Sequence, residues 1–313
     1  MDRHFEGRVV AITGSGRGIG RETALLFARQ GAKVVVNDLG GAPIGGGADQ
    51  SIAQTVVDEI RAMGGEAVAE TSNMSTMEGG RNLVGAALDS FGRLDFLINN
   101  AGIIRPAPLL EMTEEDFDIV IAVNLKGYFA TIKAALEHII KSRGAIVNYS
   151  SPSGWGHWGM TNYSAAKEGV TGLTRSLARE VGEYGVRVNA VRPIAAGSTM
   201  DIPAIRRTLE ESARLDVPLN SMQRLPWNNV MPELRNPAAV AAWLCTDHAS
   251  VFSGREFYIA GSQVAIVADP ELTRDHFNAN GWSFEDLCNE EIVHGLTYNQ
   301  HNAFAPKGEP KTL

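Results

Sequence analysis

Tyr163 and Lys167 lie four residues apart in the helical segment YSAAK. Residues at that spacing stack on one helix face, so the phenol and the amine are predicted to be neighbours. A phenol ordinarily titrates near ~10, and nearby positive charge lowers that pKa. Such a phenol can exchange a proton with an alcohol oxygen while hydride moves to or from a nicotinamide. Because such pairs are also common on solvated helices, a catalytic prediction depends on the residues around them.

Two further kinds of polar residue are candidates for the same reaction. A strand over 146–149 ends in the segment Ser150-Ser151-Pro152-Ser153-Gly154, and a hydroxyl at a strand end can hold a substrate oxygen beside the tyrosine. Asn124 lies in a helical stretch, where an asparagine on an apolar face is locally unfavourable. We expect Asn124 either to bind a water that links Lys167 to solvent or to be a buried structural amide.

A glycine-rich turn over 13–20 (TGSGRGIG) follows a strand at 8–13 and leads into a helix at 18–30. Glycines let the backbone approach a pyrophosphate closely, and the amides and dipole of a helix N-terminus favour that anion. A second strand at 32–37 completes a βαβ unit, which is the context of a dinucleotide site. The turn residues predicted to bind the cofactor are Gly14, Ser15, Arg17, Gly18, Ile19 and Gly20.

Asp38 ends the second strand and favours NAD over NADP. Its carboxylate can accept hydrogen bonds from the adenosine ribose and would repel a 2′-phosphate. Arg17 favours NADP instead, because a basic side chain in the glycine turn can bind the 2′-phosphate. Asn100, Ala101 and Gly102 follow a strand at 94–98, and ligands of open sheets bind at such carboxyl ends. These three residues are also predicted to contact the cofactor.

Strands and helices alternate along most of the chain. The predicted strands are 8–13, 32–37, 66–70, 94–98, 144–149, 186–191 and a last run at 254–267, and the main helices are 18–30, 52–63, 78–91, 114–141 and 163–184. This rhythm predicts an α/β Rossmann fold, a doubly wound parallel sheet of about seven strands flanked by helices.

Three regions depart from the alternation of strands and helices. Residues 40–50 are too rich in glycine for a regular element and are predicted to form a loop. Residues 194–235, with one helical stretch near 203–214, are predicted to cover the substrate. We therefore expect a single Rossmann-type domain over 1–268, followed by a C-terminal extension over 269–313.

The composition narrows the class of partner. Of the 313 residues, 44% are hydrophobic and 20% charged, and the net charge of −8 argues against binding nucleic acid or an anionic membrane surface. We expect a small-molecule substrate instead. The start MDRHFEGRVV lacks the apolar run of a signal peptide, and no uninterrupted apolar stretch is long enough to span a membrane, so we expect a cytoplasmic protein. Cys245 and Cys288 form no CxxC pair, and no metal site is expected.

From Gly7 to Val267 the sequence resembles the short-chain dehydrogenase/reductase family. The resemblance rests on TGSGRGIG, NNAG, VNLKG, the serine segment, YSAAK and RPIAAGSTM, which occur in the family's order. It implies that the family's catalytic tetrad is Asn124, Ser151, Tyr163 and Lys167. The spacing from Ser151 to Tyr163 is one residue shorter than is usual, so Ser150 remains an alternative. We choose Ser151 because the family's Ser-x-Ser-Gly pattern matches from there.

The resemblance also implies further cofactor contacts. Tyr163 and Lys167 are implied to contact the cofactor in addition to their catalytic roles. Thr199, which follows Pro193, corresponds to the residue that contacts the nicotinamide carboxamide. Where the family usually has an acidic residue near adenine, this chain has Asn73-Met74. The usual Pro-Gly pair is replaced here by Pro193-Ile194.

Within the family, three features resemble the dehydrogenase module of multifunctional β-oxidation enzymes. These are the segment NDLGG with the long loop after it, the YSAAK string and the AGSTM string. The resemblance implies either oxidation of 3-hydroxyacyl-CoA with NAD or the activity of related members on steroids and other ring compounds. Because family members are commonly tetramers or dimers, it also implies a homo-oligomer.

The loop between Ser151 and Tyr163 is predicted to line the substrate pocket. Its tryptophans indicate an apolar or ring-containing substrate, unless they pack against a neighbouring subunit or the C-terminal extension. His157 is either a second acid/base or an ordinary polar contact. The predicted substrate residues are Ser153, Trp155, His157 and Trp158 of this loop, with Met200 and Trp227 from the covering segment.

We predict an oxidoreductase that interconverts a secondary alcohol and a ketone, with Tyr163 as the acid/base. Ser151 orients the substrate oxygen, Lys167 tunes the phenol, and Asn124 positions a relay water. One rival is an epimerase or dehydratase that uses NAD transiently. Another is a catalytically silent nucleotide-binding scaffold, which the presence of all four tetrad residue types disfavours.

Overall fold

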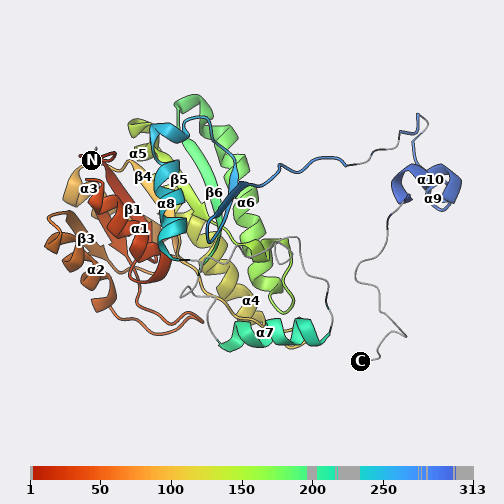
Figure 1. Ribbon diagram of the computed structural model, residues 1–313, viewed down its shortest axis with the longest axis horizontal. Coiled ribbons are helices and arrows are strands. Elements are labelled where there is room, and N and C mark those ends of the chain that lie inside the picture. Colours follow the sequence, from red (N-terminus) through yellow and green to blue (C-terminus); the bar gives the residue numbers. More distant parts are fainter. Residues whose placement is uncertain are drawn as a thin grey trace.

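The computed structural model describes residues 3–195, 203–215, 217, 233–273, 275, 277–279, 281–298 and 300. Within these residues an eight-stranded sheet has the order β3-β2-β1-β4-β5-β6-β7-β8 (Figure 1). The strands are β1 (Val9–Thr13), β2 (Lys33–Asn37), β3 (Glu66–Glu70), β4 (Phe96–Asn99), β5 (Ala145–Tyr149), β6 (Arg187–Ile194), β7 (Glu256–Ala260) and β8 (Gln263–Ile266). The first seven pair in parallel, which confirms the predicted doubly wound Rossmann architecture.

The predicted strand count needs one correction. The run 254–267 was expected to be a single strand, but it folds back at the Gly261-Ser262 turn into β7 and an antiparallel β8. Gly261 has a φ of 54°, which glycine adopts readily, and Ala260 pairs with Gln263 across the turn. The sheet therefore has eight strands, with an antiparallel strand at one edge.

Ten α-helices occur in the described residues and alternate with the strands. They are α1 (Gly18–Arg29), α2 (Ser51–Ala62), α3 (Met77–Phe91), α4 (Glu114–Ile121), α5 (Gly127–Ser142), α6 (Thr161–Val181), α7 (Pro203–Arg214), α8 (Arg235–Leu244), α9 (Phe284–Leu287) and α10 (Glu290–Thr297). The predicted helix 114–141 is α4 and α5 joined by a π-helical segment, Ala122–Lys126. The helix expected near 203–214 is α7.

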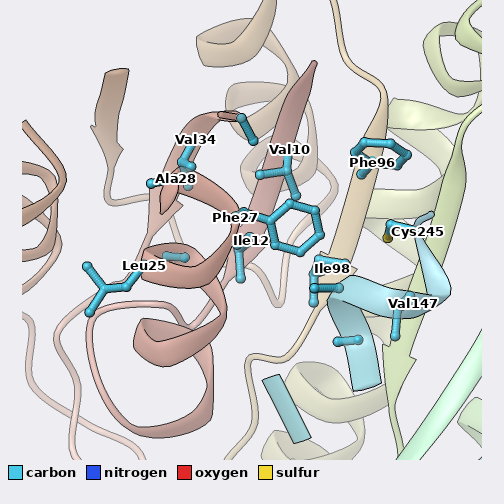
Figure 2. Packing of buried hydrophobic residues seen from close by; sticks show 14 of the residues in the cluster. Val10, Ile12, Leu25, Phe27, Ala28, Val34, Phe96, Ile98, Val147 and Cys245 are labelled. Carbon is cyan, nitrogen blue, oxygen red and sulfur yellow. The ribbon is translucent and has the colours of Figure 1, made fainter. Parts of the chain in front are cut away.

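Side chains alternate between the two faces of the sheet along each strand, and helices bury both faces. On β1, Val10 and Ile12 join the core under α1, α2 and α8. Val9 and Ala11 join the opposite core, under α3, α5 and α6. Figure 2 shows the first of these cores, where Phe27 of α1 lies beside the β1 side chains. These two cores hold the carboxyl ends of β1 and β4 in register, which is where the site forms.

The continuous helical segment Glu114–Ser142 contains an 18-residue window with a mean hydropathy of 1.4, which by length and composition alone could cross a membrane. Of that window, 44% is buried inside the fold, and core helices of soluble proteins meet the same criteria. Its α5 part packs against α3 and buries Ile132, Ala135 and Ile139 in the sheet core. We therefore describe it as a core helix.

Beyond β8 the chain runs away from the sheet, and α9 and α10 lie apart from it (Figure 1). The two helices contact each other. Several of their apolar side chains are exposed, including Phe284 and Leu287.

Candidate active site

A cavity of about 510 Å³ opens at the carboxyl ends of β1, β4 and β5, where the strand order reverses between β1 and β4. This is the position at which doubly wound sheets bind ligands. The cavity reaches from Asp38 at the end of β2 to Tyr163 on α6, so it joins the predicted cofactor residues to the predicted catalytic ones. The predicted residues that line it are Gly14, Arg17, Gly18, Ile19, Asp38, Asn73, Met74, Asn100, Ala101, Gly102, Ser151, Tyr163, Lys167 and Pro193.

The glycine turn leads directly into α1, whose N-terminus faces the cavity through Gly18 and Ile19. Gly14 and Gly18 have φ values of 61° and 56°, in the left-handed region that glycine tolerates. A Cβ on Gly14 would lie 2.8 Å from the Ala101 Cα, so a side chain there would collide with backbone. Bare glycine backbone at a helix N-terminus fits a dinucleotide pyrophosphate.

Two residues predicted to bind the cofactor stand behind the turn, outside the cavity lining. The Ser15 hydroxyl is buried and donates to the Ile12 carbonyl at 2.8 Å. Gly20 packs against the turn, since a Cβ there would lie 2.2 Å from the Gly14 carbonyl oxygen. Both residues shape the turn from behind.

The Asp38 carboxylate is held by backbone amides of two loops. Its Oδ2 accepts from the Gly16 amide at 2.9 Å and its Oδ1 accepts from the Gly40 amide at 2.7 Å. The Arg17 guanidinium also lines the cavity and donates to the Gly41 carbonyl at 3.4 Å. Asp38 is therefore fixed at the cavity wall, whereas Arg17 is exposed at its rim.

The loop over 40–50 forms part of the cavity wall, a role the sequence analysis did not foresee. Its lining residues are Gly41, Ala42, Pro43, Gly45, Gly46 and Gly47. The Ile104 amide donates to the Pro43 carbonyl at 3.1 Å, and the Arg105 guanidinium bonds the Ile44 carbonyl. Arg105 also pairs with Asp116 at 2.9 Å, so this loop is tied to α4 through Arg105. The glycine content predicted a loop, but the place where a loop packs depends on contacts with residues distant in the sequence.

Tyr163 is 7% exposed and its phenol forms a hydrogen bond with the Ser151 side chain. Burial raises the pKa of Tyr163 to about 12, and the bond to Ser151 opposes that rise. Ser150 points elsewhere, because its hydroxyl donates to the Lys167 carbonyl at 2.7 Å. Of the two serines, Ser151 is therefore the one placed beside the phenol.

Lys167 is 3% exposed, and its ammonium group lies over the Tyr163 ring, 5.6 Å from the centroid. Nζ donates to the Tyr149 carbonyl at 2.7 Å and to the Tyr128 hydroxyl at 3.2 Å. Burial, followed by the positive charge of Arg192, lowers the pKa of Lys167 to about 7. The YxxxK spacing thus brings the two groups together as predicted.

The pKa of Tyr163 is raised in this structure, whereas the sequence led us to expect that Lys167 would lower it. Desolvation of the buried phenolate is the larger effect and moves that pKa upward. The same desolvation disfavours a charged Lys167. The two groups therefore favour their neutral forms, and a further positive charge in the cavity is needed to favour the phenolate.

Asn124 lies in the π-helical segment and is fully buried. Its Nδ2 donates to the carbonyls of Ile103 and Val120, each at 2.9 Å. Its Oδ1 is buried with no hydrogen-bond partner in the described part of the chain, and a Cβ on Gly102 would lie 2.6 Å from it. Buried acceptors are ordinarily paired, so this oxygen fits the predicted water-binding role.

The predicted substrate residues of the serine–tyrosine loop stand outside the cavity lining. Trp155 packs over Arg192, whose guanidinium carbon is 4.6 Å from the ring centroid. His157 shares a hydrogen bond with Ser153, its Nδ1 lying 3.3 Å from the serine hydroxyl, and burial lowers its pKa. Trp158 is half-buried. Packing occupies Trp155 and internal hydrogen bonds occupy Ser153 and His157, and none of the four loop residues lines the cavity.

Three predicted contacts, Thr199, Met200 and Trp227, lie outside the described residues. Apolar residues that the sequence analysis missed line the catalytic end of the cavity, namely Ile103, Ile119 and Val123. They come from the segment after β4 and from α4, which the chain order does not place near Tyr163. Within the described residues no group of three His, Cys, Asp or Glu side chains gathers as a metal site would require.

The family model for short chain dehydrogenases matches residues 8–207, which include the glycine turn and the Tyr163–Lys167 pair. The chain belongs to this family. Membership makes it an oxidoreductase of the short-chain type. A short-chain type dehydrogenase/reductase of Mycobacterium tuberculosis is 40% identical over 83% of this chain and 85% of its own length.

The chain also resembles the peroxisomal multifunctional enzymes, as the sequence analysis predicted. Identity to peroxisomal multifunctional enzyme type 2 of Drosophila melanogaster is 47% over 61% of this chain. That match spans only 32% of the Drosophila enzyme, so the similarity concerns one part of a longer protein.

Among solved structures, a short chain dehydrogenase from Mycobacterium paratuberculosis bound to NAD is 29% identical, with a TM-score of 0.74. The similarity covers 82% of this chain and 97% of that one.

Proposed function

We propose that this protein interconverts a secondary alcohol and a ketone with NAD(H) as the hydride carrier. One observation carries the proposal: the Ser151-bonded phenol of Tyr163 and the amine of Lys167 line the same cavity as Asp38 and the glycine turn. A nucleotide site and an acid/base pair that share a cavity suit hydride transfer coupled to proton transfer.

The residues divide the proposed reaction between them. The nicotinamide, when bound, supplies the hydride acceptor or donor. Tyr163 accepts the hydroxyl proton during oxidation, and Ser151 holds the substrate oxygen beside the phenol. Lys167 binds the cofactor ribose and supports the phenolate, while Asn124 positions a relay water through its unpaired Oδ1.

The cofactor preference that we propose is NAD over NADP. Its support is Asp38, whose carboxylate is pinned at the cavity wall by two backbone amides and would repel a 2′-phosphate. The NAD bound in the mycobacterial relative agrees with this preference. The test is the ratio of kcat/KM for the two cofactors, and a preference for NADP(H) would overturn it.

We propose an apolar or ring-containing substrate, on the basis of Ile103, Ile119 and Val123 at the catalytic end of the cavity. A 3-hydroxyacyl-CoA is the favoured candidate within that class, because of the similarity to the peroxisomal multifunctional enzymes. A hydroxysteroid is the alternative. Panels of 3-hydroxyacyl-CoA, hydroxysteroid and aryl alcohol, read by NADH fluorescence, distinguish these classes.

The same screen separates the rival chemistries. Net conversion of added NAD to NADH excludes an epimerase or dehydratase that uses NAD transiently. Binding of NADH without turnover on any panel would instead support a silent scaffold.

We further propose a cytoplasmic homo-oligomer, either a tetramer or a dimer, with residues 1–268 as one domain and 269–313 as an extension. The family resemblance supports the homo-oligomer, and the negative net charge, which disfavours an anionic membrane surface, agrees with the cytoplasm. Light scattering of the full chain measures the oligomeric state, and a monomer at all concentrations would contradict it.

A further inference from the structure

Arg192 of β6 is a fully buried arginine beside the candidate catalytic serine. Its exposed fraction is 0%. Nε donates to a Glu256 carboxylate oxygen at 2.5 Å, and Nη2 donates to Glu168 at 2.8 Å. Glu256 is itself 2% exposed and also pairs with Arg175. Arg192 is thus held from the β7 and α6 sides by carboxylates.

The third Arg192 nitrogen bonds the backbone of the candidate catalytic serine. Nη1 donates to the backbone carbonyl of Ser151 at 2.6 Å. That carbonyl also accepts from the Gly154 amide at 3.1 Å, and the Ser151 hydroxyl oxygen accepts from the Ser153 amide at 3.1 Å. With its carbonyl and hydroxyl oxygen both fixed from behind, Ser151 retains its hydroxyl proton for a partner in front.

The surroundings leave Arg192 little freedom. Trp155 covers the guanidinium face, and a Cβ on Gly154 would lie 2.6 Å from Nη1. Burying a charge costs several kcal/mol even when it is paired, and apolar residues often fill such space with equal or better stability. Stability alone is therefore a poor reason for an arginine here, whereas a rigid two-way link between Glu256 and Ser151 needs its planar fork.

We propose that Arg192, clamped by Glu256, is a positioning residue that sets the orientation of Ser151 toward Tyr163. Arg192 touches no reacting atom and is not itself a catalytic residue: its positioning role runs through the bond to Ser151, and is separate from the effect of its charge on the pKa of Lys167. The proposal rests on the proposed function for its effect on turnover, but the link between Arg192 and the serine segment can be measured without substrate.

The first test is backbone amide exchange in Arg192→Met and in a matched control, Arg187→Met. Arg187 lies on the same strand and donates to the carbonyls of Leu244, Thr246 and Ala249, away from the cavity. We expect faster exchange across 150–157 only in Arg192→Met, and faster exchange near 244–249 only in Arg187→Met. Unchanged protection at 150–157 in Arg192→Met would overturn the proposal.

The second test compares turnover with cofactor binding, using reduction of acetoacetyl-CoA by NADH or the most active pair of the screen. Arg192→Met should lower kcat by roughly 10-fold or more, since small misplacements near the chemistry have such effects. The dissociation constant of NADH should stay within about 2-fold of wild type, because Arg192 lies behind the serine. Arg187→Met should leave kcat unchanged.

If Arg192→Met does not fold, Arg192→Lys and Glu256→Gln take its place. A lysine side chain is not able to bond Glu256 and Ser151 together as the guanidinium fork does, so an intermediate loss of kcat is expected. A kcat equal to wild type in all folded variants would refute the positioning role. Wild-type protein that turns over no substrate would refute the proposed function instead, and the exchange data would still decide the structural link.

Discussion

Replacing Lys167 with methionine removes a buried amine whose folded-state pKa is about 7, against 10.5 for a free lysine. Between those two values the unfolded chain carries the proton and the folded chain does not. The unfolded state therefore binds more protons in this window, and wild-type stability rises with pH there because of this residue. Below pH 7 the folded protein keeps a charged amine buried, and its destabilising effect is fully present.

The size of the effect follows from the pKa difference. Each unit corresponds to about 1.4 kcal/mol, so the full window amounts to roughly 5 kcal/mol. Lys167→Met also loses the bonds to the Tyr149 carbonyl and the Tyr128 hydroxyl, but that loss is nearly constant with pH. The diagnostic quantity is therefore the change with pH of the stability difference between wild type and variant.

Urea unfolding at a series of pH values measures this difference. From about pH 7 upward, the free energy of unfolding of wild type should rise relative to that of Lys167→Met by about 1.4 kcal/mol per pH unit. Lys126→Met is the matched control, because Lys126 lies in the neighbouring π-helical segment but is exposed, and no such gain is expected for it. A stability difference that stays flat from pH 7 to about 10 would refute burial as the cause of the shift.

Three further predictions concern single contacts. Tyr128→Phe removes an acceptor from Lys167 and a donor to the Tyr149 carbonyl, and should destabilise the fold by roughly 1 kcal/mol, measured by urea unfolding. Gly20→Ala places a Cβ against the Gly14 carbonyl and should weaken NADH binding by at least about 10-fold in a fluorescence titration, since the turn must shift. Asp38→Ala should move the NAD-to-NADP ratio of kcat/KM toward NADP by about 10-fold or more; an unmoved ratio would remove Asp38 as the basis of cofactor choice.

Much of the candidate site could be predicted from the spacing of residues close together in the sequence. The four-residue step from Tyr163 to Lys167, the glycine turn before a helix and Asp38 at a strand end are all short-range patterns, and the structure gathers them at one cavity. The alternation of strands and helices likewise predicted the parallel sheet, because a crossover helix leaves few topologies open.

Features that depend on distant partners were not predictable in this way. The backfolding of β8 depends on a two-residue turn within an apolar run that reads equally well as one strand. Trp155 was assigned to substrate because of its place in the chain, but its face meets Arg192, whose burial no local pattern reveals. The choice between Ser150 and Ser151 likewise depended on which hydroxyl faces α6 backbone and which faces Tyr163.

The most direct test of the proposed chemistry is the rate of NADH formation by wild type and Tyr163→Phe, with the most active alcohol from the screening panels. Phenylalanine keeps the ring and removes only the hydroxyl that exchanges the proton. We predict that kcat falls by about 10² or more, as loss of general acid/base catalysis requires, while NADH binds as tightly as in wild type. Full activity in Tyr163→Phe would contradict the assignment of this residue as the acid/base.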